Sequence, residues 1–204
     1  VETWAKSKNC TEIIGPMAFS DKEPQGFLTK GFEEKAMLVT NHSFSFMTDF
    51  IKENHYENFV DLVQYDVPIT AQILNRYKNF NERVSKNLKI KTVEFTSTKA
   101  VKPYVKPVFD LINKTYTEIY GFTKLTEDEM TEFAERFLPL LNPKLIKMIT
   151  DENGELLAFV IAMADLSEAI KNSRGRILPF GWARIFWAMK TSKRLQLLLG
   201  AIHP

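Results

Sequence analysis

The stretch from Leu145 to Ala164, LIKMITDENGELLAFVIAMA, decides the fold. Two apolar runs, Leu145 to Thr150 and Glu155 to Ala164, flank the tetrapeptide Asp-Glu-Asn-Gly. Asn153-Gly154 is a strong hairpin signal because both residue types accept a positive φ. We therefore predict two antiparallel strands joined by a tight turn at the centre of a sheet.

The segments around this hairpin show further strand and helix patterns. Strands are predicted over Leu88 to Thr96 and Arg194 to Ile202. The predicted helices are Pro103 to Tyr120, one that follows the capping box Thr126 to Glu129, Ser167 to Ser173, and Pro179 to Lys190. This order indicates an α+β domain after Leu88.

The first part of the chain carries weaker signals. Short strands are predicted at Thr11 to Gly15 and Asn58 to Val67, and a helix at Phe46 to Tyr56; Ala36 to Thr40 is a further short apolar segment. A connecting helix is predicted over Ala71 to Lys86, and we place the domain boundary there. The expected organisation is a first unit over 1–70, a linker helix over 71–87 and a second unit over 88–204, with two partial mixed sheets.

Composition excludes several classes of protein. The chain has 204 residues, 45% of them hydrophobic and 25% charged, with 27 basic and 25 acidic residues. This balance favours neither a nucleic-acid nor a membrane partner. One cysteine, Cys10, and three histidines offer no disulfide framework and no metal site. Without a signal peptide or a long apolar run, the expected location is the cytoplasm.

The order of elements from Leu88 resembles the front half of the GNAT (acyl-CoA N-acyltransferase) fold. LLLGAIHP, residues 197–204, looks like the fourth strand of that family, and the segment before 70 resembles the back half of the same fold. GPMAFSD at 15–21, Gly-Phe at 31–32 and RILPFGW at 176–182 are similar to a two-domain bacterial GNAT-like group without an assigned substrate. The chain therefore looks like an internal fragment of a tandem protein.

The resemblance implies binding of acetyl-CoA or another acyl-CoA at the end of the fourth strand, where backbone groups pair with the pantetheine amides. It assigns these contacts to Ala201, Ile202 and His203. No residue matches the family's Gly-rich phosphate loop, so this piece is expected to bind CoA poorly and to have little acetyltransferase activity. In the first unit the family's tyrosine position falls near Phe44 or Phe46, which leaves the catalytic residues unassigned.

Two further residues are candidates for a substrate pocket, Asp165 and Trp182. Asp165 ends a predicted strand and could orient an amine, but a cap for the following helix is the favoured interpretation. His203 could act as a base, although a solvated turn residue is the more common role of such a histidine. Cys10 is interpreted as a buried small hydrophobe.

The helix over 179–190 carries a stripe of Trp182, Ile185, Phe186 and Met189. We expect this stripe to pack against the second unit's sheet; a pocket wall or dimer contact comes next, and a membrane-surface helix is least favoured. Basic residues flank the helix and either attract CoA phosphates or keep an apolar insertion soluble.

The leading hypothesis for function is acyl transfer from acyl-CoA to an unidentified small-molecule amine. The alternative is a non-catalytic protein of this fold that acts through protein contacts made by the aromatic helix. Neither a metal, a nucleic acid nor a membrane is expected as a partner, and a homodimer is left open.

Overall fold

The computed structural model describes residues 1–204 except Val39, Leu88 and Pro204. The chain divides into two compact units, which are described separately below. The first comprises Val1–Gln64 with Tyr120–Thr123, and the second comprises Tyr65–Ile119 with Lys124–Pro204. The placement of a boundary between two acyltransferase-like halves stays a prediction.

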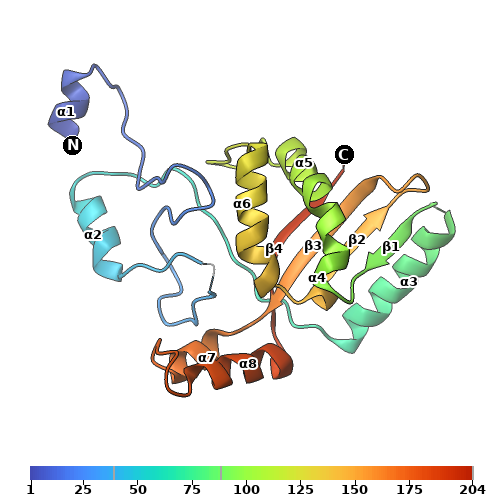
Figure 1. Cartoon of the computed structure of the whole chain (residues 1–204). Helices are drawn as coiled ribbons and strands as arrows, with labels where there is room; N and C mark the ends of the chain where they lie inside the picture. Colours follow the sequence, from blue (N-terminus) through green and yellow to red (C-terminus); the bar gives the residue numbers. More distant parts are fainter. Residues whose placement is uncertain (39, 88, 204) are drawn as a thin grey trace. The chain divides into compact units, whose positions relative to one another are not determined.

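A four-stranded sheet organises the second unit (Figure 1). Its strands are β1 (Lys91–Glu94), β2 (Ile146–Thr150), β3 (Leu156–Ala164) and β4 (Leu195–Ile202). Their order in the sheet is β1-β2-β3-β4, and each pair is antiparallel. The predicted strands of this half and the α+β class are confirmed. The described residues form one antiparallel sheet, so the prediction of two partial mixed sheets is wrong for them.

Helices cover the sheet on the face turned to the viewer in Figure 1. They are α4 (Thr98–Val101), α5 (Val105–Thr115) and α6 (Glu127–Phe137), with 3₁₀ turns at Lys102–Tyr104, Leu138–Leu140 and Pro143–Leu145. α5 packs on β3 and β4, and α6 packs on α5. The rings of Phe109 and Phe133 meet edge-on, with centroids 5.8 Å apart. The helix predicted over Ala71 to Lys86 is present as α3 (Ala71–Asn87), and its role as a linker stays a prediction.

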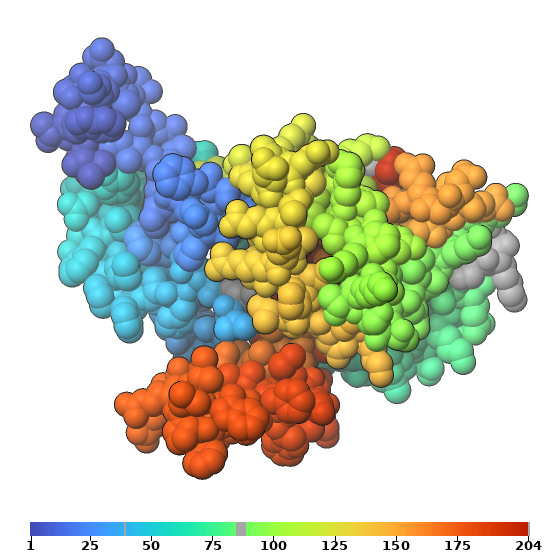
Figure 2. Space-filling model, viewed as in Figure 1, coloured from blue at the N-terminus to red at the C-terminus, as the bar shows by residue number. Residues whose placement is uncertain are grey.

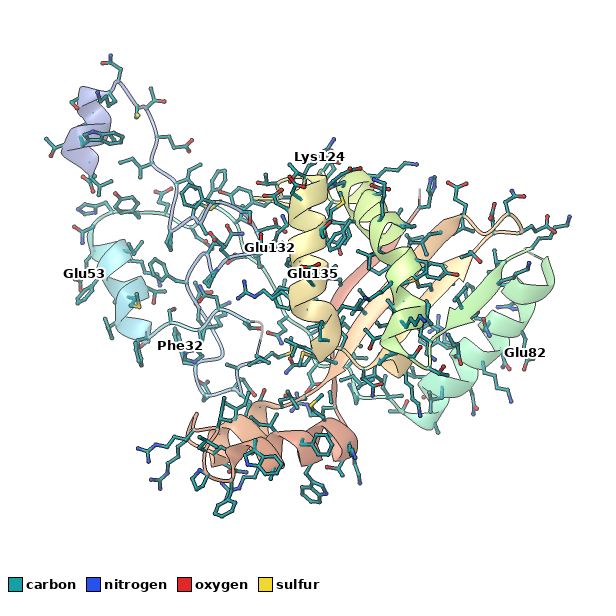
Figure 3. All side chains as sticks on the ribbon, viewed as in Figure 1. Phe32, Glu53, Glu82, Lys124, Glu132 and Glu135 are labelled. Carbon is teal, nitrogen blue, oxygen red and sulfur yellow. The ribbon has the colours of Figure 1, made fainter. Side chains whose placement is uncertain are left out.

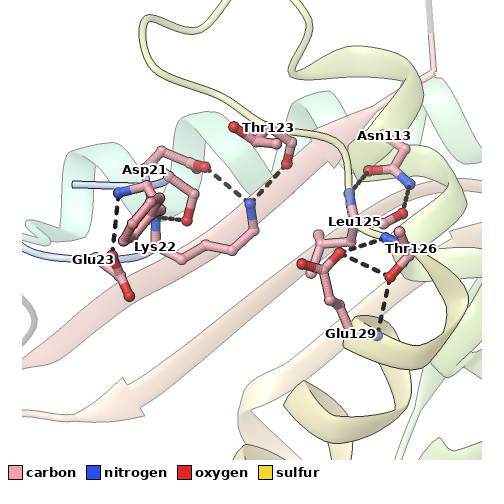
Figure 4. Close-up of polar contacts among 10 residues, drawn as sticks. Asp21, Lys22, Glu23, Asn113, Thr123, Leu125, Thr126 and Glu129 are labelled. Atoms are coloured by element: carbon pink, nitrogen blue, oxygen red, sulfur yellow. Dashed lines mark hydrogen bonds and ion pairs between the residues drawn. The ribbon is translucent and has the colours of Figure 1, made fainter. Parts of the chain in front are cut away.

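The start of α6 shows how the sequence fixes a helix end. The Thr126 hydroxyl accepts from the Glu129 N–H, and the Glu129 carboxylate accepts from the Thr126 N–H at 2.7 Å (Figure 4). The predicted capping box is therefore confirmed. Just before it, the Asn113 side chain accepts from the Leu125 N–H and donates to the Leu125 carbonyl, which ties α5 to this helix start.

The central hairpin is also confirmed, with a different turn chemistry. Gly154 has φ of 88°, whereas Asn153 does not take a positive φ. The Asp151 carboxylate organises the turn instead, because it accepts from the N–H groups of Asn153 and Glu155 at 2.9 and 2.7 Å. These bonds lower the pKa of Asp151, the bond from Glu155 most. The Asp151 carboxylate therefore stabilises the turn in the way that we expected of Asn153.

The first unit contains α1 (Glu2–Ser7) and α2 (Ser45–Glu53), which confirms the predicted helix near Phe46. The strands predicted at Thr11 to Gly15 and Asn58 to Val67 are wrong, because the structure has no strand there. Val39 in the apolar segment Ala36 to Thr40, like Leu88 at the start of the first predicted strand of the other unit, lies outside the described residues. A strand needs a neighbour for its backbone groups, and these apolar runs have none.

α7 (Ser167–Asn172) and α8 (Gly181–Thr191) form a helical hairpin between β3 and β4. It lies beyond one end of the sheet, at the bottom of Figures 1 and 2. Both helices match their predicted positions. The turn between them, 174–180, carries positive φ values at Arg174 and Gly175.

Candidate functional site

β4 lies at the edge of the sheet, where its outer backbone groups can meet a ligand. The His203 N–H donates to the Leu157 carbonyl at 2.7 Å, in the register that pairs Phe159 with Ala201. Bonded and non-bonded pairs alternate along an antiparallel ladder. The N–H and C=O groups of Ala201 and His203 therefore face β3, and those of Gly200 and Ile202 face outward.

The side chain of Tyr116 hydrogen-bonds the outward backbone groups of Gly200. Its hydroxyl donates to the Gly200 carbonyl at 2.9 Å and accepts from the Gly200 N–H at 3.3 Å. Tyr116 sits at the C-terminal end of α5, so this helix delivers a phenol to the strand edge. Among the hydrogen bonds of the described residues, none is made by the outward groups of Ile202.

An open pocket of about 530 Å³ lies at this end of β4, within the second unit. Its lining comes from the end of α5 and the residues that follow, and from β3 and β4. The lining residues are Thr115, Tyr116, Ile119, Phe159, Val160, Gly200, Ala201 and Ile202. An apolar hollow with a few convergent polar groups is the usual form of a small-molecule site.

A nitrogen pair stands beside the same strand end. Lys114 Nζ lies 2.5 Å from Nε2 of His203. An ammonium group has only donors, so Nε2 acts as the acceptor in this contact. The pair adds a cation and an imidazole next to the outward groups of Ile202. Such groups can attract an anion or accept a proton.

β4 also contains a bulge. Ile161 pairs with Leu199, but Ala162 pairs with Leu197, so Leu198 is the extra residue. Bulges bend a strand, increase its twist and are common next to active sites. The bulge separates the two halves of β4, with the pocket at its C-terminal half.

The structure places two of the three residues of the predicted cofactor strand in the lining of this pocket. Ala201 is buried against the core, Ile202 is 76% exposed, and His203 is half-buried. Ala201 and Ile202 line the pocket, whereas His203, the next residue, is not a lining residue and contacts Lys114. Their role in binding an acyl-CoA stays a prediction.

Asp165 and Trp182, the predicted pocket residues, lie elsewhere. The Asp165 N–H donates to the Arg194 carbonyl, which places Asp165 at the opposite end of β4 from Gly200. Six residues of strand span about 20 Å. Trp182 lies in α8, where its indole N–H donates to the Pro179 carbonyl at 3.0 Å. The structure therefore does not bring these two residues to the pocket by β4.

A partly buried polar cluster surrounds Asp165 instead. Its carboxylate accepts from the Ser167 N–H and from Gln196 Nε2 at 3.0 and 2.8 Å, and lies 3.8 Å from Nε of Arg194. Burial acts to raise the pKa of Asp165, but these bonds and the Arg194 charge outweigh it and lower the pKa. The bond from the Ser167 N–H ties Asp165 to the first turn of α7, although the N-cap residue of this helix is Leu166, which makes no side-chain cap.

The packing predicted for α8 is wrong. Trp182, Phe186 and Met189 are exposed, and only Ile185 of the predicted stripe is half-buried. The buried side of α8 is instead narrow and is built from Gly181, Ile185 and Ala188. The interpretation of Cys10 as a buried residue is also wrong, because its side chain is exposed.

Sequence reasoning missed Tyr116 and Lys114 as site residues. Tyr116 fits the apolar periodicity of its helix, so the pattern assigned it to the core. A buried tyrosine usually needs a partner for its hydroxyl, and this need distinguishes Tyr116 from a purely apolar core residue. The partner, Gly200 on β4, lies 84 residues further along the chain, so the sequence alone does not reveal it.

Comparison with known proteins gives two relatives. The chain is 26% identical over 196 residues to the bacterial ceramide synthase of Caulobacter vibrioides, covering 93% of this chain and 48% of that protein. It is 24% identical over 192 residues to protein YghO of Escherichia coli K12, covering 94% of this chain and 48% of that protein. The chain thus spans about half the length of these curated relatives. No family model matches the sequence.

No described helix is both long and apolar enough to cross a membrane. Among the same residues, no group of three or more His, Cys, Asp or Glu side chains is placed to hold a metal ion.

Proposed function

We propose that this chain is part of an N-acyltransferase that moves an acyl group from an acyl-CoA to a long-chain amine. The name of the Caulobacter relative supports the acceptor class, because a ceramide is the amide of a long-chain amino alcohol. The resemblance to the GNAT superfamily supports acyl-CoA as the donor. The observation that carries the proposal is the pocket at the outward-facing edge of β4.

The strand edge suits the amide groups of a pantetheine arm. The outward N–H and C=O of Ile202 can pair with one amide as a further strand would. The groups of Gly200 are held by the Tyr116 hydroxyl, which a second amide could replace. The apolar lining from Ile119, Phe159 and Val160 then offers room for the first carbons of the acyl chain.

The reaction requires two proton movements. The amine nitrogen attacks the thioester carbonyl carbon, so an N–C bond forms and the C–S bond breaks. The attacking nitrogen loses a proton to a base, and the departing thiolate gains one. The Tyr116 hydroxyl can donate to the thiolate, and the imidazole of His203, next to Ile202 at the strand end, can take the proton of the amine once its Nε2 is released from Lys114.

Binding can be tested on the 204-residue chain by NMR titration with decanoyl-CoA, which detects the weak binding expected without a phosphate loop. We expect chemical-shift changes at the amides of Gly200, Ala201 and Ile202. Changes confined to the α7–α8 hairpin, or none at saturating ligand, would contradict the proposed binding edge.

Turnover can be tested on the full-length gene product by mass spectrometry of the N-acyl product. Tyr116→Phe should lower kcat about a hundredfold with little change in KM, the usual scale for a lost general acid. Tyr77→Phe, which removes an exposed hydroxyl from α3, is the matched control. Equal activity of the two variants would exclude the proton donation by Tyr116.

The alternative function, contact with another macromolecule without catalysis, has one observation in its favour. α8 exposes aromatic side chains that no part of the described unit covers. If the full-length product binds no acyl-CoA and forms no amide, this alternative replaces the enzyme proposal.

A further inference from the structure

An apolar surface lies on the α7–α8 hairpin, away from the pocket at β4. Its members are large, exposed side chains from the 174–180 turn and from α8. We call this set the α8 surface: Ile177, Leu178, Phe180, Trp182, Phe186, Trp187 and Met189. Leu178, Phe180 and Trp187 are 75, 72 and 70% exposed. The side chains of this hairpin extend away from the sheet in Figure 3.

The packing of Gly181 and Ala188 turns the side chains of the α8 surface toward solvent. A Cβ on Gly181 would collide with the Arg176 carbonyl oxygen, so the turn is folded tightly onto the start of α8. Gly181 is buried, and Ala188, seven residues later on the same side, is half-buried. Small residues face inward, and the tryptophans face solvent. This is the reverse of a helix that buries its aromatic face.

After Glu168, in the first turn of α7, the charged residues of the hairpin and of the strand that follows have a single sign. The sequence contains no Asp or Glu after Glu168, yet seven of the 27 basic residues follow it. They are Lys171, Arg174, Arg176, Arg184, Lys190, Lys193 and Arg194. Arg194 pairs with Asp66 and Asp165, and Lys190 lies 4.4 Å from the centre of the Phe186 ring. Within the described residues, Arg174, Arg176 and Lys193 form no ion pair.

We propose that the α8 surface docks on an anionic lipid bilayer. Tryptophan and phenylalanine partition to the level of the lipid headgroups, and Lys and Arg beside them attract anionic lipid. A hydrophobic surface with a basic border is the usual pattern of proteins that lie on a membrane without crossing it. The exposed α8 residues remove the basis for the expectation that this helix avoids membranes.

Other occupants fit the surface less well. A second copy of the chain would bring two sets of uncompensated basic residues together, which costs free energy. A single-stranded nucleic acid would use the aromatic rings and the cations, but it would leave the aliphatic Ile177 and Leu178 without partners. A bilayer accommodates all three kinds of side chain.

The first test is co-sedimentation of the chain with vesicles. Vesicles of equal parts phosphatidylcholine and phosphatidylglycerol should bind the protein, and pure phosphatidylcholine should bind it about tenfold less or worse. In a Trp4→Phe variant, the emission of Trp182 and Trp187 should move to shorter wavelength on binding. Bound protein with unchanged emission would show that another surface makes the contact.

Variants identify the residues responsible. Trp187→Ser combined with Leu178→Ser should reduce vesicle binding about tenfold, whereas Phe19→Ser, at an exposed aromatic of the first unit, should not change it. The double variant Arg174→Glu/Arg176→Glu should reduce vesicle binding by a similar factor or more. The matched charge control is the double variant Arg76→Glu/Lys78→Glu on α3. Thermal melting checks that each variant folds.

Three outcomes would overturn the proposal. They are equal binding to neutral and anionic vesicles, vesicle binding that survives both hairpin variants, and stronger binding to a single-stranded oligonucleotide than to vesicles. A concentration-dependent dimer that is abolished by Trp187→Ser would assign the α8 surface to a second copy instead. None of these measurements involves acyl-CoA, so their result is independent of the proposed catalytic function.

Discussion

The two units contain similar apolar patterns but use them differently. In the second unit, Ile146, Met148 and Phe159 are buried between the sheet and its helices. In the first unit, among the described residues, only Ala5 and Ser43 are buried. Runs such as Asn58 to Val67 have strand composition but remain exposed. An apolar run therefore becomes a strand only when a paired neighbour satisfies its backbone.

Polar contacts hold the first unit instead of a core. The Leu28 N–H donates to the Ser43 hydroxyl at 2.9 Å, and the Asn41 amide donates to the Gln25 and Gly26 carbonyls. Lys22 Nζ donates to the Thr123 carbonyl at 2.8 Å (Figure 4). Hydrogen bonds near water contribute little net free energy each. The first unit should therefore be the less stable of the two.

The largest expected effect contrasts two isoleucines. Ile146→Ala removes a side chain that is 1% exposed, and it should cost about 2–5 kcal/mol of unfolding free energy in the sheet unit. Ile14→Ala, at a residue 43% exposed in the first unit, should cost less than about 1 kcal/mol. Urea denaturation followed by circular dichroism measures both. Equal costs would show that the first unit has a core after all.

A pair of glycines comes next. Gly181→Ala places a methyl group against the Arg176 carbonyl and should destabilise the hairpin by about 2–3 kcal/mol. Gly26, in the first unit, has φ of 72° and open space around it, so Gly26→Ala should cost only the strain of a left-handed residue, about 1 kcal/mol. Thermal melting ranks the two. If Gly181→Ala is the milder change, the turn is not folded onto α8 as described.

The same difference explains what the sequence can predict about the fold. Around the central hairpin, periodicity, the capping box and turn residues agree with one another, and every predicted strand and helix from β1 to β4 is present. Before Ala71, the predicted helix near Phe46 is correct and the predicted strands are not. A helix satisfies its own backbone, so local sequence determines it, whereas a strand depends on partners that local sequence does not contain.

The candidate site shows a similar division. The strand β4 was predicted from its local apolar pattern, whereas Ala201 to His203 were assigned as cofactor contacts by the resemblance of residues 197–204 to the fourth strand of the GNAT fold. Tyr116 and Lys114 reach that strand from α5, and only tertiary packing shows it. The direction of the α8 residues was predicted wrongly because periodicity identifies a stripe but not the side on which it is buried. In α8, the close approach of the Arg176 carbonyl to Gly181 determines which side of the helix is buried.

A smaller effect separates the two helix starts. Thr126→Ala removes the capping box of α6 and should cost about 1 kcal/mol. α2 begins after Phe44 without a side-chain cap, so Ser45→Ala in its first turn should change stability by less than about 0.5 kcal/mol. Chemical denaturation measures the difference. A cost for Ser45→Ala as large as that for Thr126→Ala would mean that α2 is held by a polar contact of Ser45.

The smallest effect appears only in acid and concerns Asp165. Because the pKa of Asp165 is lowered in the folded unit, its carboxylate adds stability above its ordinary pKa of about 3.9, and this contribution is lost as the pH falls through the folded pKa.

Asp165→Asn keeps an acceptor for the Ser167 N–H but loses the charge, so its unfolding free energy should fall less steeply below about pH 4 than that of the parent chain. Asp49→Asn removes the same charge from an exposed position on α2 and isolates the effect of net charge. The measurement is a series of urea melts from neutral pH to about pH 2. If Asp165→Asn keeps the full acid slope of the parent, the hydrogen bonds from Ser167 and Gln196 do not stabilise the carboxylate, and the charge of Asp165 adds nothing to its contact with the first turn of α7.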